Sequence, residues 1–240
     1  MPRFFTERIA GDTAWIEGAD AAHICRSLRM EAGDALVVCD LRGMDYDCVI
    51  ESAAPEEVVL RVERSYPCVA EPRVKIRLFQ ALPKGDKLEY IVQKSTELGV
   101  DEIIPVLTER CISRPDGKAM DKKRQRLGKI AAEAAKQSGR GKIPAVGPLL
   151  SYREALVAMG ESETALLCYE NATVPLREAL KGQAQSVAVL IGSEGGFSPE
   201  EAAQAAAAGI GAVSLGPRIL RCETAPVCVL SAILFVGGEF

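Results

Sequence analysis

The alternation of strand-like and helix-like segments after residue 73 constrains the fold more than any other feature of this sequence. Strands are predicted at five places, 74–80, 101–107, 164–169, 186–192 and 212–216. The segment 186–192 is continuously apolar, as expected for a strand that is buried on both faces. Strands interleaved with helices favour an α/β fold with a mostly parallel sheet, whose ligand site lies in loops beyond the carboxyl ends of the strands.

Apolar residues recur at helical spacing between these strands and after the last of them. Helices are predicted at 87–98, 121–138, 151–159, 198–209 and 224–236. The fourth has the clearest start, because Ser198 suits a cap, Pro199 the first helical position and Glu200 the first turn. Gly99 and Gly139 suit the ends of the first two helices.

The first 72 residues have a different pattern. Short β-like segments lie at 35–40, 46–52 and 56–64, separated by turn-forming residues, and this spacing is typical of a small barrel. The segment 65–73 contains two prolines and is predicted to be a linker. The sequence therefore predicts two domains, residues 1–72 and 73–240.

Composition excludes several classes of protein. Of the 240 residues, 48% are hydrophobic and 26% charged, as in globular proteins, and no apolar run approaches the roughly 20 residues of a membrane span. The first residues lack the apolar core of a secretory signal, so we expect a cytoplasmic protein whose eight cysteines are reduced. With no C-x-x-C motif and one histidine, His23, we expect neither a metal site nor an imidazole-based catalytic unit.

Charge is unevenly distributed along the chain, although the net charge is only -4. Residues 73–150 hold 17 Lys and Arg against 9 Asp and Glu, whereas 1–72 hold 7 against 14 and 151–240 hold 5 against 10. A basic segment within an acidic protein is expected where one face meets a polyanion. The alternative is a solvated helix face with no partner.

A glycine-rich loop follows the apolar strand, at 192–197. Its spacing is G-x-x-G-G and not the dinucleotide fingerprint G-x-G-x-x-G, and Glu194 would repel a pyrophosphate. Because glycines allow close approach of the backbone, we expect a ligand of the adenosine type that carries little negative charge. The alternative is a tight turn that requires positive φ.

The loop after the last strand sets Arg218 and Arg221 close together, followed by Glu223 at the start of an apolar helix. Two guanidinium groups suit a phosphate or an anionic nucleophile. The alternative is that one arginine pairs with Glu223 and only fixes the turn.

These motifs resemble those of the bacterial 16S rRNA uracil N3-methyltransferases of the SPOUT, or trefoil-knot, superfamily, which modify the uridine at position 1498. The resemblance runs nearly end to end, with matches at 2–5, 23–30, 93–100, 109–111 and 137–140. It is most specific in Ile191-Gly192-x-Glu194-Gly195-Gly196 and Leu215-Gly216-x-Arg218-Ile219-Leu220-Arg221-x-Glu223-Thr224. The chain departs from the family where Ser193 replaces the usual proline and where Pro226 interrupts the start of the last helix.

The resemblance implies an N-terminal PUA-like RNA-binding β-barrel and a C-terminal SPOUT α/β trefoil-knot domain that binds S-adenosylmethionine. It further implies a homodimer that acts on 16S rRNA or the small ribosomal subunit. The implied cofactor contacts are Leu167, Cys168, Tyr169, Ile191, Gly192, Glu194, Gly195, Gly196, Leu215, Gly216, Ile219 and Leu220.

Catalysis is assigned to charged residues, and RNA binding to charged residues and one glutamine. We expect Arg221 or Arg218 to favour the anion of the uracil N3, while Glu223 either accepts the imide proton or positions an arginine. The RNA contacts predicted are Arg3, Arg26, Arg29, Lys84, Lys87, Lys94, Gln137 and Arg140. Lys94 has a second interpretation, since Glu97 lies three residues further along a predicted helix and suits an ion pair.

Three alternatives stay open from the sequence. A nucleotide-dependent oxidoreductase rests only on the glycine-rich loop, whose spacing and Glu194 argue against it. The second alternative is a non-catalytic RNA-binding protein of the same fold, and the presence of both complete loop motifs argues against it. A related SPOUT enzyme that methylates another rRNA site would share all of these features.

Overall fold

The computed structural model describes residues 1–180, 182 and 184–240, and it divides into two compact units. The first unit contains Met1–Glu71 together with Ala135–Ile143, and the second contains Pro72–Ala134 and Pro144–Phe240. No pattern in the sequence indicated that Ala135–Ile143 would return to the first unit.

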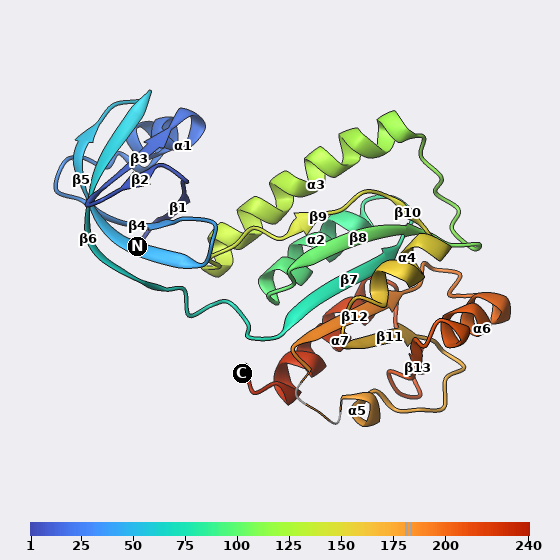
Figure 1. The fold of residues 1–240 in the computed structure, drawn as a ribbon. Coiled ribbons are helices and arrows are strands. Elements are labelled where there is room, and N and C mark those ends of the chain that lie inside the picture. The colour runs from blue at the N-terminus through green and yellow to red at the C-terminus, as the bar shows by residue number, and fades with distance from the viewer. Residues whose placement is uncertain (181, 183) are drawn as a thin grey trace. The chain divides into compact units, whose positions relative to one another are not determined.

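The first unit is a curled, PUA-like sheet of six strands in the order β1-β4-β5-β6-β3-β2 (Figure 1). Its strands are β1 (Arg3–Phe5), β2 (Ile9–Ala10), β3 (Thr13–Glu17), β4 (Ala35–Cys39), β5 (Met44–Ala53) and β6 (Glu57–Pro67). Alternate residues of β4, β5 and β6 are buried, such as Leu36, Ile50 and Leu60, which confirms the predicted β segments. Because β6 continues to Pro67, the first part of the predicted linker was wrong.

Two short helical segments of the first unit were not predicted. α1 (Gly18–Ala22) leads directly into η1 (His23–Leu28), a π-helical turn that ends where Arg29 takes the left-handed conformation at φ 55°. Both are shorter than the window over which helical periodicity is visible, so the sequence carried no signal for them.

The second unit is built on a parallel sheet in the order β10-β8-β7-β12-β11-β13, with β9 paired to β8. Its strands are β7 (Lys75–Ala81), β8 (Glu102–Leu107), β9 (Ala145–Val146), β10 (Leu150–Ser151), β11 (Thr164–Cys168), β12 (Ser186–Ile191) and β13 (Gly211–Val213). The predicted parallel α/β sheet is confirmed. Every residue of β12 except Ser186 is buried. β13 is shorter than predicted, because Ser214 makes only an isolated bridge to Pro175 before the chain turns at Gly216.

The helices of the second unit follow the predicted segments closely. They are α2 (Lys87–Glu97), α3 (Gly117–Ser138), α4 (Tyr152–Met159), α5 (Leu176–Ala179), α6 (Pro199–Ala207) and α7 (Thr224–Val236). The sequence did not predict α5. The end of α3, from Ala135, belongs to the first unit. The predicted cap of α6 is confirmed as a capping box, in which Ser198 accepts from the N–H of Glu201 and the Glu201 carboxylate accepts from the N–H of Ser198.

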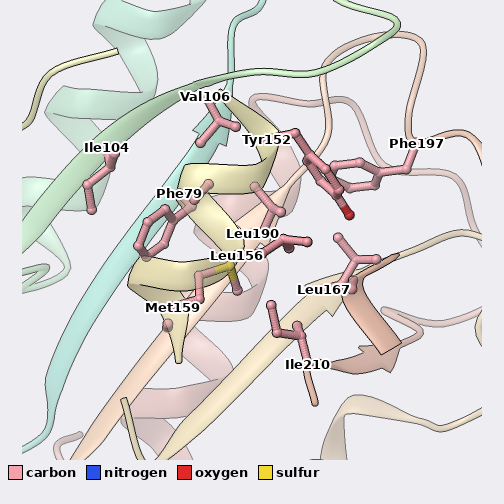
Figure 2. Packing of buried hydrophobic residues seen from close by; sticks show 13 residues of the cluster. Phe79, Ile104, Val106, Tyr152, Leu156, Met159, Leu167, Leu190, Phe197 and Ile210 are labelled. Carbon is pink, nitrogen blue, oxygen red and sulfur yellow. The ribbon is translucent and has the colours of Figure 1, made fainter. Parts of the chain in front are cut away.

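A buried cluster packs α4 and α6 against one face of this sheet (Figure 2). Phe197, 1% exposed, lies beside Tyr152 with ring centroids 6.2 Å apart, and the Tyr152 hydroxyl donates to the carbonyl of Glu201 at 2.6 Å. Phe197 is the last residue of the glycine-rich loop, so the core anchors the end of that loop at the carboxyl edge of the sheet.

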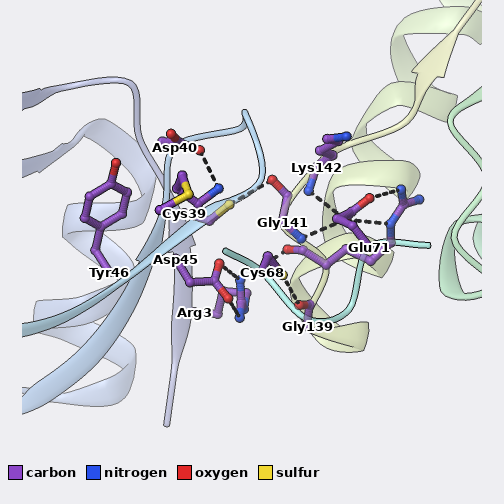
Figure 3. Close-up of polar contacts among 12 residues, drawn as sticks. Arg3, Cys39, Asp40, Asp45, Tyr46, Cys68, Glu71, Gly139, Gly141 and Lys142 are labelled. Carbon is purple, nitrogen blue, oxygen red and sulfur yellow. Dashed lines mark hydrogen bonds and ion pairs between the residues drawn. The ribbon is translucent and has the colours of Figure 1, made fainter. Parts of the chain in front are cut away.

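Buried polar contacts join Ala135–Ile143 to the rest of the first unit (Figure 3). Arg140, 1% exposed, donates from Nη2 to Oε2 of Glu71 at 2.8 Å. The other oxygen of Glu71 accepts from the N–H of Gly141 at 2.8 Å and of Lys142 at 3.0 Å. This ion pair therefore fixes the chain after α3 in the first unit.

Candidate functional site

A cavity of about 660 Å³ lies at the carboxyl ends of β11, β12 and β13 in the second unit. Its walls are the loop after β11, the glycine-rich loop 192–196 and the loop 214–220. This is where a parallel sheet places its ligand. The residues implied for cofactor binding all line the cavity except Leu167, which is fully buried within β11.

The glycine-rich loop has little room for a side chain at any of its three glycines. A Cβ on Gly195 would lie 2.9 Å from the Cβ of Arg110. A Cβ on Gly192 would lie 3.1 Å from the Cα of Gly196, so the two ends of the loop approach closely. Gly196 has a φ of 63°, and a Cβ there would lie 2.9 Å from Oε1 of Glu170. The loop is therefore a tight turn, as one interpretation of the sequence had it, and its backbone also lines the cavity.

The side chain of Glu194 is held by hydrogen-bond donors from α2 and from the segment before it. Its carboxylate accepts from the backbone N–H of Lys84 at 3.1 Å and from Nζ of Lys87 at 2.8 Å. Partial burial opposes ionisation, but these donors outweigh it and hold the pKa of Glu194 below its usual value. Glu194 is therefore a charged, partnered carboxylate at the wall of the cavity.

Lys87 also reaches the loop that carries the arginines. Its Nζ lies 3.6 Å from Oε2 of Glu223 and 4.0 Å from Sγ of Cys222. Burial raises the pKa of the Cys222 thiol to about 12, and this neutral thiol donates to Oε2 of Glu223 at 3.1 Å. The hydrogen bond from Cys222, together with Lys87, lowers the pKa of Glu223. Lys87 thus joins the two motif loops, a role that sequence reasoning missed.

Both predicted catalytic arginines are exposed, and Arg218 lines the cavity. Within the described part of the chain neither guanidinium has an ion pair or hydrogen bond. The alternative that an arginine pairs with Glu223 does not hold in this structure, because Glu223 pairs with Lys87. The arginine side chains are therefore available to an anion.

The residues predicted to contact RNA fall into two groups. Four have ion-pair partners within the protein: Arg3 with Asp45, Lys87 with Glu194, Lys94 with Glu97, and Arg140 with Glu71. The other four are exposed, namely Arg26, Arg29, Lys84 and Gln137. Arg140 is buried as well as paired, so its guanidinium does not present a surface to RNA.

The cavity also involves residues that the sequence analysis did not select. Glu170 and Thr173 line it from the loop after β11. The signal that would have found them is their position, since they follow a strand whose carboxyl end lies at the same edge as the two motif loops. Glu170 is exposed and has no ion pair or hydrogen bond among the residues that the structure describes.

Residues 1–180, 182 and 184–240 include all eight cysteines and the one histidine of the chain. No group of three or more His, Cys, Asp or Glu side chains there could hold a metal ion, and all eight cysteines are free thiols. None of the helices described is long and apolar enough to cross a membrane.

Comparison with known proteins gives consistent matches over the whole chain. Residues 70–234 match the family described as RNA methyltransferase domain, and residues 16–63 match the family described as RNA methyltransferase PUA domain. The chain is 34% identical over 247 residues to ribosomal RNA small subunit methyltransferase E of Bacillus subtilis, covering 98% of this chain and 96% of that protein. It is 33% identical to the protein of the same name from Mycobacterium tuberculosis, covering 93% and 86%.

Solved structures give the same result. A ribosomal RNA small subunit methyltransferase E from Neisseria gonorrhoeae bound to S-adenosyl methionine matches with a TM-score of 0.87 and 30% identity, covering 98% of both chains. A methyltransferase from Legionella pneumophila in complex with the same cofactor matches with a TM-score of 0.86 and 31% identity, covering 97% and 96%.

Proposed function

Since this chain belongs to the family of SPOUT RNA methyltransferases that includes ribosomal RNA small subunit methyltransferase E, we propose that it methylates N3 of one uridine in 16S rRNA, with S-adenosylmethionine as methyl donor. The observation that carries the proposal is the cavity at the carboxyl ends of β11, β12 and β13, whose walls include the two motif loops. The relatives named above and the cofactor bound to the two similar structures support it.

The cavity suits a cationic, adenosine-containing ligand. Two carboxylates, Glu170 and Glu194, belong to its lining, and the glycine-rich loop offers backbone groups without side chains. A sulfonium carries positive charge, so the carboxylate of Glu170, which is unpaired among the described residues, favours it and would repel a pyrophosphate. When bound, S-adenosylmethionine supplies a methyl group activated by its sulfonium. We assign its contacts to the cavity-lining segments 168–169, 191–196 and 215–220.

The arginines are proposed to activate the nucleophile. Uracil N3 is a weakly acidic imide that must lose its proton before or during attack, and a nearby cation favours the resulting anion. Arg218 and Arg221 are exposed on the loop at the cavity and have no acidic partner among the described residues, so their charge is available for this purpose.

Glu223 fits a positioning role better than that of a base. Its pKa is lowered by the Cys222 thiol and by Lys87, and a carboxylate with lowered proton affinity is a weaker proton acceptor. We therefore propose that Glu223 holds the arginine loop against α2 through Lys87, which lies 3.6 Å away.

Self-association is part of the same proposal. The end of α7 exposes Phe235 and Val236, while Leu230, Ile233 and Leu234 of the same helix are buried. Large exposed apolar side chains beside a buried stripe suit contact with a second copy of the chain. We propose a homodimer that acts in the cytoplasm, where small ribosomal subunits assemble.

The test is incubation of the purified protein with labelled S-adenosylmethionine and either free 16S rRNA or small subunits that lack the modification. Mass spectrometry of the nucleosides, with mapping of the site, is expected to give N3-methyluridine at one position. Methylation of another atom or nucleotide would overturn the proposed specificity. Cofactor binding without any transfer to RNA would overturn the proposed substrate.

A further inference from the structure

The basic residues of the segment 73–150 are concentrated on α3. Residues 117–138 contain seven Lys and Arg against two Asp and Glu, so this helix carries most of the basic excess of the segment 73–150. By contrast, four of the residues predicted to contact RNA are already paired with acidic side chains. Positive charge therefore also remains on a surface outside the RNA contacts that the sequence motifs indicate.

Four of these side chains share one face of the helix. At 3.6 residues per turn, Lys118, Lys122, Arg126 and Lys129 lie within a narrow stripe about 17 Å long. We call these four residues the basic stripe. The buried residues of α3 lie on the opposite face and comprise Met120, Leu127, Ala131 and Ala134. Because that burial fixes the rotation of the helix, the basic stripe faces away from the core.

Acidic side chains of the protein neutralise little of the positive charge of the basic stripe. Lys118, Lys122 and Lys129 are exposed and have no ion pair or hydrogen bond in the part of the chain that the structure describes. Arg126 pairs with Glu89 of α2 at 2.8 Å, yet 65% of its side chain is exposed. Like charges one turn apart destabilise a helix, so this row carries a cost that an anionic partner would offset.

We propose that the basic stripe binds the phosphate backbone of the RNA substrate, as a docking surface outside the cavity. Lysine ammonium groups act as point charges for phosphates, and contacts of this kind orient a nucleic acid without reading its bases. The inference goes beyond the proposed function, because it concerns how RNA is held and not which atom is methylated.

The test compares two triple variants of the full chain. The first, Lys118→Gln, Lys122→Gln and Lys129→Gln, removes the unpaired charges of the stripe. The matched control, Lys75→Gln, Arg153→Gln and Arg177→Gln, removes the same charge at exposed positions of the second unit that have no ion pair among the described residues. Binding of transcribed 16S rRNA is measured across a range of KCl concentrations.

Each lost phosphate contact lowers the slope of log K against log salt by about 0.7 to 0.9. We therefore expect the slope of the stripe variant to fall by about 2 to 3, while the control variant keeps the slope of the unaltered protein. A slope unchanged in the stripe variant, or reduced equally in the control, would overturn the inference. Calorimetric binding of S-adenosylmethionine should be equal in all three proteins and serves to show that they are folded.

Failure of this inference is distinguishable from failure of the proposed function. The salt slope requires no methyl transfer, and the methylation assay uses the unaltered protein. An unchanged slope alongside normal methylation would leave the proposed function in place and make the stripe a solvated face.

Discussion

Nζ of Lys87 lies 2.8 Å from Oε1 of Glu194, although the two residues are 107 positions apart in the chain. Through this contact the first turn of α2 holds the middle of the glycine-rich loop, and a second contact at 3.6 Å connects it to Glu223. One ammonium group thus links the two motif loops, which form two of the three walls of the cavity.

Replacing Lys87 with Met is expected to weaken binding of S-adenosylmethionine by roughly 3-fold to 10-fold, because both loops lose a shared partner. Lys87→Arg keeps a cation there and should recover part of the affinity. The matched control is Lys75→Met, at an exposed lysine of β7. Calorimetric titration provides the measurement, and equal affinities for the Met variants at both positions would contradict the bridging role.

The Glu194 carboxylate predicts a dependence of stability on pH. Its folded pKa lies below the ordinary value of 4.5, so its ionised form stabilises the fold above that pH, and this contribution is lost as pH falls through the folded pKa. The difference in unfolding free energy between the unaltered protein and Glu194→Gln should be constant near neutral pH and shrink below about 4.5. Denaturant titrations across pH measure it, and a difference that grew on acidification would refute the assignment.

Arg218→Lys and Arg221→Lys separate catalysis from cofactor binding. Lysine keeps the charge but not the planar fork of donors, so at least one variant should lower single-turnover methyl transfer by about 10-fold or more. Cofactor affinity should change much less. Arg153→Lys, on the exposed side of α4, is the control. Unchanged transfer in both variants would exclude the arginines from the activation of N3.

Arg140→Met is expected to destabilise the first unit by about 3 to 5 kcal/mol, because it leaves the Glu71 carboxylate without its buried partner. Arg42→Met removes an exposed arginine from the same unit and should change stability little. Chemical denaturation provides both values. A variant as stable as the control, yet weak in RNA binding, would restore Arg140 to the surface that contacts RNA.

Two glycine substitutions should have opposite effects. Gly196→Ala forces a side chain into the left-handed region and against Glu170, with an expected cost of about 1 to 2 kcal/mol and weaker cofactor binding. Gly128→Ala lies within α3 with nothing within 4 Å of the added carbon, and should stabilise the protein by about 0.5 to 1 kcal/mol. Thermal unfolding compares them, and two effects of the same sign would argue against the loop geometry.

A feature could be predicted from the sequence when it depends on residues close together in the chain. Strand and helix periodicity, the cap at Ser198 and the order of the motif loops are local, so the parallel sheet and the edge that carries the cavity followed from the sequence. The resemblance to a family named the cofactor and the substrate, which periodicity does not encode. The short segments α1, η1 and α5 were missed because each spans less than two helical turns.

The partners of the charged residues were decided only by the tertiary structure. Lys87 and Arg140 look like surface cations in the sequence, yet one joins two loops and the other is buried against Glu71. An ion pair depends on where the fold brings distant residues, and sequence spacing reports only neighbours on the same element. The sequence by itself therefore determined the architecture and the location of the site, while the fold decided which charges remain free to meet RNA.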